Sequence, residues 1–575
     1  MSKLGIRDIV GPTMVGPSSS HTAGALRIAK MARTLCGETP KKVEYRLLGS
    51  FAHTLTGHGT DKAIVAGMLG FESDDLRIRK SFSYAKQCGL EYSFKICPDE
   101  PFDHPNTIEM QIVTQTGDDL FVRGVSIGGG AAMLTRIDDI DVELTGELNS
   151  LVIKQNDVNG VLTHICSALS INGINIASAR LHRKAKGETA FTIIKTDQDI
   201  PDYVVHAIMT DEDILGVRVV PRSVASGRKT DPTIDLLEAD KEFKAADFKS
   251  GSELLALCKK KKAPISQVFL DRERALSHCD GFEDDTPAYI KHVVAVMKES
   301  TEVPLDKPKK SMGGLLGGES QKMVALAQSQ TGPCDGVLSS AAACAMAVLE
   351  TNATMGRIMA APTAGSSGVI PGVLFGLWAW KKITADQIET AIATASAVGY
   401  LITLNATVAG AEGGCQAEVG AAAAMAAAAV TEIYGGTPEQ CLGAASNALM
   451  NLMGLVCDPV GGLVEAPCQK RNAAGAAIAL VSAQMSLAGV GNLVRFDQMV
   501  DTMYAVGKSI PYELRETALG GMATCPDACA ACEKHRLKKL KKVEKAASKK
   551  AKAEMAGETG ESKEAAETES WICYT

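Results

Sequence analysis

The sequence predicts a multidomain protein with α/β and all-α parts: an α/β domain, a small βαββαβ domain and a C-terminal helical domain. Three observations predict this organisation. The chain has 575 residues, which is enough for three or four domains. Residues 1–222 hold short β-rich segments between stretches of helical periodicity, whereas residues 251 to about 524 are rich in Gly and Ala and read as helical throughout. The composition, 46% hydrophobic and 22% charged, is ordinary for a soluble globular protein.

Residues 1–145 are expected to form the first domain, with α/β architecture. A helix is predicted from about residue 19 to 35, because Ala25, Leu26, Ile28 and Ala29 share one apolar side. The serines at 18–20 can cap its N-terminus. The β-rich segments 107–113 (TIEMQIV) and 119–125 (DLFVRGV) are expected to be strands.

Residues 146–222 show a different pattern. Strands are predicted at 149–154, from 173, at 189–195 and at 217–220, with a helix over 161–170 and a second one before the last strand. This order resembles the ACT fold, a small-molecule regulatory domain. ACT domains commonly show Asp-x-Pro-Gly at the first turn, where this chain has Asp157-Val158-Asn159-Gly160. The resemblance implies an amino-acid effector site between paired domains, formed by Asn156, Asp157, Gly160 and Asn175.

The rest of the chain divides into a linker, a helical domain and a tail. Residues 223–250 are polar and read as a linker, residues 251–532 as the helical domain, and residues 533–575 as a charged, disordered tail. The tail is expected to be solvated, with nucleic-acid or membrane contact by its basic half as the alternative. The longest uncharged stretch, 390–411, could span a bilayer by length. Its polar residues favour a buried helix instead, and 421–430 (AAAAMAAAAV) also reads as buried.

Charge and cysteine content exclude several classes of protein. The net charge of −7 and the 5% of aromatic residues argue against a nucleic-acid-binding protein. The first residues lack a signal-peptide core, so a cytoplasmic location without membrane insertion is expected. There, the sixteen cysteines should not form a disulfide framework.

Three of these cysteines, Cys415, Cys457 and Cys468, each lie beside Gly or Pro and therefore at turns or helix ends. Soft ligands at such wide spacing suit an iron–sulfur cluster better than a zinc finger. With only three cysteines bound, one iron of a [4Fe–4S] cluster would stay open as a Lewis acid. The spacing alone favours buried structural thiols over a cluster.

Several longer motifs follow one another along the chain in the order in which they occur in a known family. They are Gly11–Gly24 (GPTMVGPSSSHTAG), Gly49–Asp61 (GSFAHTLTGHGTD), Gly313–Glu319 (GGLLGGE), Ala361–Gly372 (APTAGSSGVIPG) and the three cysteine segments. Together they resemble the iron–sulfur-dependent L-serine dehydratases (L-serine ammonia-lyases) over residues 1–524. The resemblance implies that L-serine is converted to pyruvate and ammonia, with Cys415, Cys457 and Cys468 as cluster ligands. No pyridoxal phosphate is expected, because no lysine context for a Schiff base accompanies the glycine segment Ser126–Gly130.

The resemblance also gives roles to polar residues of the motifs. His21 and His58 are the candidates for proton transfer, because imidazole titrates near neutrality; which one is the base is left open, as is a structural role. Substrate binding is expected at the predicted helix N-terminus, with an ordinary N-cap as the alternative, and at a hydroxyl-rich turn that could equally be a tight helix connection. These residues are Ser18, Ser19 and Ser20 at the helix, and Thr363, Ala364, Gly365, Ser366 and Ser367 at the turn.

The cysteines near the end of the helical domain carry a separate question. Cys525, Cys529 and Cys532 have the spacing of a radical-SAM motif, but they follow the last predicted helix instead of lying in an early barrel loop. Some single-chain relatives place a cysteine there as a resting-state fourth ligand, for which Cys525 is the candidate. The other tail cysteines or a water are the alternatives.

Two other functions remain possible from the sequence. One is an L-cysteine desulfidase with the same open iron, and the other is a non-catalytic amino-acid sensor with a structural metal site. A homodimer is expected, because the predicted effector site lies between paired domains.

Overall fold

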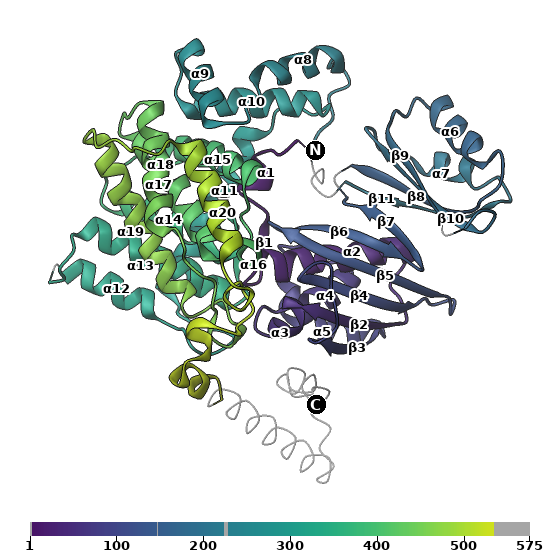
Figure 1. Ribbon diagram of the computed structural model, residues 1–575, viewed down its shortest axis with the longest axis horizontal. Helices are drawn as coiled ribbons and strands as arrows, with labels where there is room; N and C mark the ends of the chain where they lie inside the picture. Colours follow the sequence, from purple (N-terminus) through teal and green to yellow (C-terminus); the bar gives the residue numbers. More distant parts are fainter. Residues whose placement is uncertain (1–2, 147, 184, 223–227, 330, 534–575) are drawn as a thin grey trace, which may run out of the picture.

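The computed structural model describes residues 3–146, 148–183, 185–222, 228–329 and 331–533. Except for residue 533, the predicted tail 533–575 lies outside the described residues. The chain forms a mixed α/β N-terminal region and a helical C-terminal region, with a second, smaller sheet beside the first (Figure 1). The predicted combination of α/β and all-α parts is confirmed.

The N-terminal region is built on a six-stranded sheet with the order β3-β2-β4-β5-β6-β7. The β2–β3 pair is parallel and the other neighbours are antiparallel. Helices α2, α4 and α5 cover one face and close a core around Tyr45, Phe51 and Met110. The strands are β2 (Lys42–Gly49), β3 (Glu91–Cys97), β4 (Asn106–Val113), β5 (Asp119–Gly128), β6 (Ala131–Ile137) and β7 (Ile140–Leu144). The helices are α2 (Ala25–Cys36), α3 (Ser50–Thr54), α4 (Thr60–Met68), η2 (Leu76–Lys80) and α5 (Ser81–Cys88).

The helix predicted over residues 19–35 is present but begins differently. Its first turn is a π-helix, η1 (Ser19–Gly24), and α2 follows directly. Gly24 leaves room for this turn, because a Cβ there would lie 2.1 Å from Ser126 Oγ on β5. This wider turn lies at the candidate site. In proteins generally, π-helical segments are frequent at functional sites.

The second sheet has the order β11-β8-β10-β9, all antiparallel. Its elements follow the predicted βαββαβ order, and α6 and α7 cover one face. From the other face, Val152, Phe191 and Ile193 join the core of the first sheet. The elements are β8 (Asn149–Asn156), α6 (Val161–Ile171), β9 (Ile176–Arg183), β10 (Thr189–Thr196), α7 (Asp202–Ile208) and β11 (Ile214–Val220).

Two segments differ from the sequence-based expectation. The predicted linker 223–250 contains helix α8 (Leu236–Ala246), because Asp235 caps it and Phe243 and Ala246 pack against Ala275 on α10 (Ile265–Cys279). At the N-terminus, α1 (Ile6–Ile9) packs into the helical core instead of the α/β domain. The first domain as expected from residue 1 therefore overlaps both regions.

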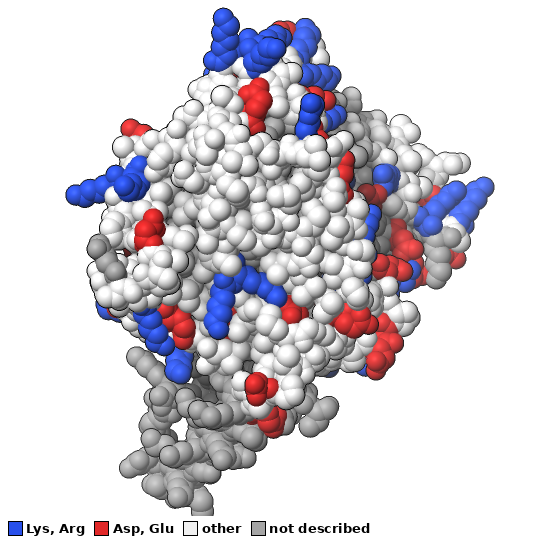
Figure 2. Space-filling view, turned by 60° about the vertical axis from the view of Figure 1, so that its left-hand side comes forward, with Lys and Arg blue, Asp and Glu red and all other residues white. Residues whose placement is uncertain are grey.

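The helical region encloses the Ala-rich helix α17, which is buried from Ala421 to Thr431 as the sequence predicts. The uncharged stretch 390–411 comprises most of α15 and the first residues of the short α16, and no described helix is long and apolar enough to span a membrane. Figure 2 shows a broad area of this side without charged side chains. The helices are α9 (Gly251–Lys261), α10 (Ile265–Cys279), α11 (Thr286–Asp306), α12 (Glu319–Ser329), α13 (Gly336–Ala353), α14 (Val369–Ala379), α15 (Ala385–Asn405), α16 (Gly410–Gly413), α17 (Ala421–Ile433), α18 (Pro438–Leu452), α19 (Cys468–Leu487) and α20 (Phe496–Ser509).

A two-stranded sheet joins the regions where the candidate site lies. Strand β1 (Thr13–Val15) pairs antiparallel with β12 (Arg357–Met359). The chain continues from the end of β1 to Ser18 and from the end of β12 to Thr363. The pairing of the two strands therefore brings two of the predicted substrate-binding segments together.

Candidate active site

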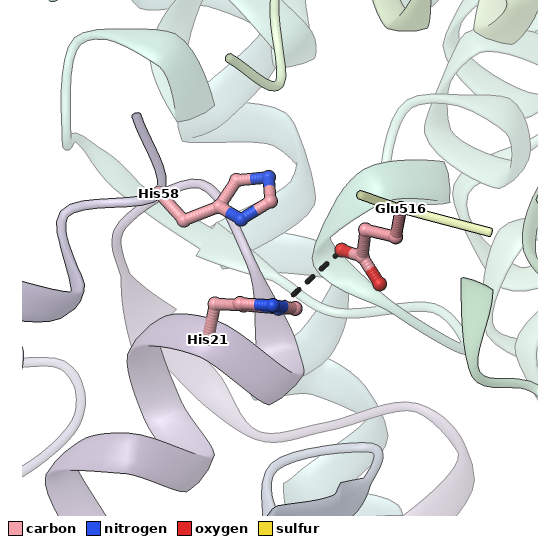
Figure 3. A group of neighbouring side chains, drawn as sticks. All are labelled: His21, His58 and Glu516. Atoms are coloured by element: carbon pink, nitrogen blue, oxygen red, sulfur yellow. Dashed lines mark ion pairs between the residues drawn. The ribbon is translucent and has the colours of Figure 1, made fainter. Parts of the chain in front are cut away.

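The first half of the site is the π-helix η1. Ser18 caps it, since its Oγ accepts a hydrogen bond of 3.0 Å from the backbone N–H of His21. Thr22 Oγ1 donates to the carbonyl oxygen of His58 at 2.7 Å, which ties η1 to the loop before α4. As a result the rings of His21 and His58 lie side by side, with centroids 4.5 Å apart (Figure 3).

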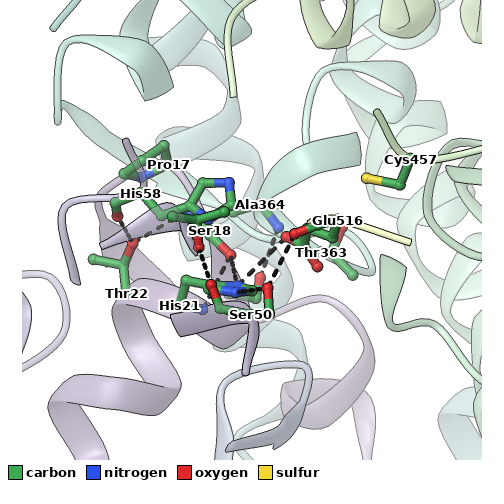
Figure 4. Close-up of polar contacts among 12 residues, drawn as sticks. Pro17, Ser18, His21, Thr22, Ser50, His58, Thr363, Ala364, Cys457 and Glu516 are labelled. Atoms are coloured by element: carbon green, nitrogen blue, oxygen red, sulfur yellow. Dashed lines mark hydrogen bonds and ion pairs between the residues drawn. The ribbon is translucent and has the colours of Figure 1, made fainter. Parts of the chain in front are cut away.

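His21 is fully buried and its ring is held from both sides. Its Nε2 lies 2.9 Å from Ser50 Oγ, and its Nδ1 lies 3.5 Å from Glu516 Oε1 (Figure 4). Ser50 Oγ donates its hydrogen to the carbonyl oxygen of Glu516, so it can only accept from His21. The proton of neutral His21 therefore belongs on Nε2, and Nδ1 faces the Glu516 carboxyl as an acceptor.

His58 differs from His21 because neither of its ring nitrogens has a hydrogen-bond partner among the described residues, although both are buried. Burial lowers the pKa of His58 to about 3. The pKa of His21 is also well below its ordinary value, through burial and the neighbouring His58. Both imidazoles are thus neutral at pH 7, and His58 has two free ring positions for a ligand.

The second half of the site holds the three cysteines. Cys415 precedes the π-helix η4 (Gln416–Gly420), Cys457 follows α18, and Cys468 begins α19. All three are buried, and burial raises the pKa of Cys415 to about 12 and those of the other two well above 9. The negative charges of Glu516 and Glu418, and then those of Cys415 and Cys468, also raise the pKa of Cys457. The Arg471 guanidinium acts in the opposite direction on Cys415 and Cys468.

Two buried carboxyl groups separate the cysteines from the histidines. Glu418 accepts a hydrogen bond from Thr363 Oγ1 at 2.7 Å, and its Oε2 lies 4.0 Å from Cys457 Sγ. Burial raises the pKa of Glu418 to about 7. The pKa of Glu516 is also raised, by burial and by the charge of Glu418. Neither Glu418 nor Glu516 was among the residues predicted for the site from the sequence.

The predicted turn 363–367 joins the two halves. The Ala364 N–H donates to Ser19 Oγ at 2.7 Å, and Ser367 Oγ donates to the Ala364 carbonyl oxygen at 2.8 Å. Ser366 closes a capping box with Thr363. Most hydroxyls of the turn therefore bond within the protein, so their first role here is to shape the connection.

A small pocket lies where these elements meet. It is lined by Pro17, Ser18, His58, Gly365, Glu418, Cys457, Pro459, Val464, Cys468 and Glu516. Of the residues predicted for the site, Ser18, His58, Gly365, Cys457 and Cys468 face this pocket. The others do not line the pocket and are all buried: Ser19, Ser20, His21, Thr363, Ala364, Ser366, Ser367 and Cys415.

Cys525 is placed apart from this group. Its side chain is exposed, with Sγ 3.9 Å from the carbonyl oxygen of Gly521, and it does not line the pocket. Cys532 lies against Gly461, since a Cβ built on Gly461 would lie 2.6 Å from Cys532 Sγ, but Cys532 does not line the pocket either. A fourth cysteine ligand thus needs a different arrangement of residues 521–532.

The predicted effector residues do not meet within one copy of the βαββαβ unit. Asn156 Nδ2 donates to Asp213 at one end of β8, where Asp157 also pairs with Arg183. Asn175 lies beside β9 at the other end, where its Nδ2 donates to Asp197. Strands of this length separate the two ends by about 23 Å. Gly160 begins α6 with a φ of 99°.

Known proteins match both halves of the chain. The family model of the serine dehydratase alpha chain matches residues 222–523, and that of the beta chain matches residues 10–136. The probable L-serine dehydratase alpha chain of Bacillus subtilis (strain 168) is 42% identical over 279 residues, 48% of this chain and 92% of the relative. The L-serine dehydratase beta chain of Peptoniphilus asaccharolyticus is 39% identical over 35% of this chain and 91% of the relative. The L-serine dehydratase of Mycobacterium bovis is 30% identical over 527 residues, 88% of this chain and 95% of the relative.

Proposed function

Because this chain belongs to the serine dehydratase family and is an L-serine ammonia-lyase, we propose that its pocket converts L-serine to pyruvate and ammonia with a [4Fe–4S] cluster. The observation that carries the proposal is the meeting of His58 with Cys457 and Cys468 in one buried pocket. No single domain contributes both groups, so the matched alpha and beta parts have to act together.

The residues fit a thiolate-bound cluster. Cys415, Cys457 and Cys468 are soft donors. All three thiols are buried near two carboxyl groups, which disfavours the thiolate form of each cysteine while no metal is bound. Metal binding deprotonates such thiols and makes them ligands. When bound, the cluster would supply a Lewis acid for the substrate hydroxyl.

The remaining steps fall to the protein's own side chains. His58 is proposed as the base that takes the Cα proton, because it faces the pocket with free ring nitrogens, whereas both nitrogens of His21 are engaged. Glu418, with a pKa of about 7, can hold a proton at neutral pH. It can give this proton to the departing hydroxyl, which then leaves as water. The aminoacrylate product then tautomerises to an imine, and water hydrolyses the imine to pyruvate and ammonia. Ser18 and the Gly365 backbone are proposed to orient the substrate carboxylate, because both line the pocket.

The experiment is to measure pyruvate release from L-serine by protein purified and reconstituted with iron and sulfide without oxygen. Cys457→Ala should lose bound iron and activity together. Cys441→Ala is the matched control, since Cys441 is equally buried in α18 but does not line the pocket. No pyruvate from iron-loaded protein would refute the function, and L-cysteine would then be tested. Full iron content in the Cys457 variant would refute the ligand assignment.

The fifteen cysteines among the described residues are all free. Free cysteines are the rule in reducing compartments, which supports the cytoplasm as the site of action.

We also propose that the βαββαβ unit is an ACT-like regulatory domain that binds an amino-acid effector. Since Asn156 and Asn175 lie at opposite ends of the sheet, one effector can contact both only if two copies pair. This supports a homodimer. Asn175→Ala should shift the dependence of rate on serine concentration without changing the maximal rate. An unchanged curve would contradict the site.

A further inference from the structure

A cavity larger than the active-site pocket lies outside it, at the boundary between the N-terminal and helical regions. It has a volume of about 160 Å³ and lies between η2, the C-terminal end of α11 and the start of β12. A cavity of about 150 Å³ holds a ring of six carbon atoms. This one therefore has room for a small ligand.

The charges around the cavity are predominantly positive. The charged residues that line it are Arg79, Lys307, Lys309, Arg357, Glu299 and Glu350. Both carboxylates are already bound within the protein. Glu299 pairs with Arg357 Nη2 at 2.6 Å, and buried Glu350 accepts from the N–H and Oγ of Ser320 and from Gln469 Nε2.

The cations, in contrast, keep free donors. Among the described residues, Lys309 makes no hydrogen bond or ion pair, and Arg79 makes only a 3.4 Å hydrogen bond to a backbone carbonyl. Arg357 Nε is buried and has no hydrogen-bond partner. A buried guanidinium N–H without an acceptor is costly, and an anion in the cavity would satisfy it.

The cavity is connected to both halves of the active site. Arg357 pairs with Val15 in the two-stranded sheet, and Ser18 follows three residues after Val15. Glu350 Oε1 accepts from Gln469 Nε2 at 3.0 Å, and Gln469 directly follows Cys468. A ligand held at Arg357 would thus bear on the segments that carry Ser18 and Cys468.

We propose that this cavity binds a small dianion of the phosphate class, either inorganic phosphate or the phosphate group of a small organic ester. Among the described residues, Lys307 pairs with Asp306 and Arg357 pairs with Glu299, so Arg79 and Lys309 are the lining cations whose charges no ion pair neutralises, and one dianion can engage both. Guanidinium and ammonium groups are the side chains that recognise phosphate oxygens.

The test is equilibrium dialysis of the reconstituted enzyme with radiolabelled inorganic phosphate and, separately, with glycerol phosphate. Saturable binding is expected for at least one of the two probes. Comparing the affinity for inorganic phosphate with that for glycerol phosphate shows whether the organic part of the ligand contributes to binding. The double variant Arg79→Gln/Lys309→Gln should weaken binding by about tenfold or more, because two charge-assisted contacts are lost. The double variant Lys259→Gln/Lys260→Gln on α9 removes the same charge far from the cavity and should bind as the parent does.

Three results would overturn the proposal. They are the absence of saturable binding by both probes at millimolar concentration, equal affinity in the Arg79/Lys309 variant, and displacement of phosphate by L-serine, which would place the anion in the substrate pocket. Because the readout is binding, the result does not depend on whether the enzyme turns over serine.

Discussion

Gly57 is the point where the loop carrying His58 rests on the backbone of the helical region, so replacing it with alanine should open the active site. A Cβ built on Gly57 would lie 2.1 Å from the carbonyl oxygen of Gly462 and 2.7 Å from its carbonyl carbon. Gly57 has no positive φ, so alanine itself is tolerated by the local backbone. The clash with the other region is therefore the whole effect of the substitution.

The size of the effect follows from this geometry. Ordinary Cβ contacts begin near 3.4 Å, so the two backbones must move apart by more than about 1 Å, at a cost of about 1–3 kcal/mol for an overpacked contact. His58 is the next residue and would move away from Cys457 and Cys468. A displacement of about 1 Å between reacting groups can lower a rate by about 100-fold.

The assay is pyruvate formation from L-serine, followed through NADH oxidation by added lactate dehydrogenase. Gly57→Ala should lower kcat by about 10- to 100-fold while the iron content stays at the parent value. Gly491→Ala is the matched control, because a Cβ there meets no atom within 4 Å. If Gly57→Ala kept kcat within about twofold of the parent, the idea that this contact sets the distance across the active site would be refuted.

Two further predictions concern buried polar groups. Burial raises the pKa of Glu273 from 4.5 to about 7, so the folded state holds this proton more tightly than the unfolded chain. The free energy of unfolding should therefore fall by up to about 3 kcal/mol as the pH rises from about 4.5 to 7. Glu273→Gln should remove this loss in urea unfolding compared at pH 5 and pH 7.5, and an unchanged difference would contradict it. Asn472→Ala should raise KM for serine several-fold and lower the melting temperature. The reason is that Asn472 Nδ2 donates to the carbonyl oxygens of Gly365 and Cys468, while its Oδ1 accepts from the Gly368 N–H. If the variant has the parent's KM and calorimetry shows that it is folded, Asn472 does not hold these segments together.

The elements that the sequence predicted are those with a strong periodic signal. The strands expected at 107–113 and 119–125 appear as β4 and β5, and the buried helix at 421–430 appears as α17. The π-helical start of the helix at Ser19 could not be predicted, because apolar spacing of 3.6 residues does not distinguish one wider turn. Helix α8 was missed because its exposed, charged surface outweighs the few residues that pack on α10.

The candidate site shows the same division at the level of single residues. Motifs led to His58, Cys457 and Cys468, since each stands in a run of Gly, Pro or hydroxyl residues with a recognisable pattern. Glu516 stands in no such run, and it reaches His21 only because its backbone has a φ of 60° and its N–H bonds to the Cys457 carbonyl oxygen. Glu516 comes close to His21 only because the helical and α/β regions pack together. A pattern read along either region alone does not indicate this contact.

This division explains why separate alpha and beta chains and one continuous chain can serve the same site. The contacts that bring His58 to the cysteines run through η1, the Gly57 loop and the β1–β12 pair, and none of them uses the covalent connection through the βαββαβ unit. The connecting unit packs on the core of the α/β region through its strands β8 and β10. A shift of that unit would reach the active site through the same α/β region, in which η1 carries His21 and the loop before α4 carries His58.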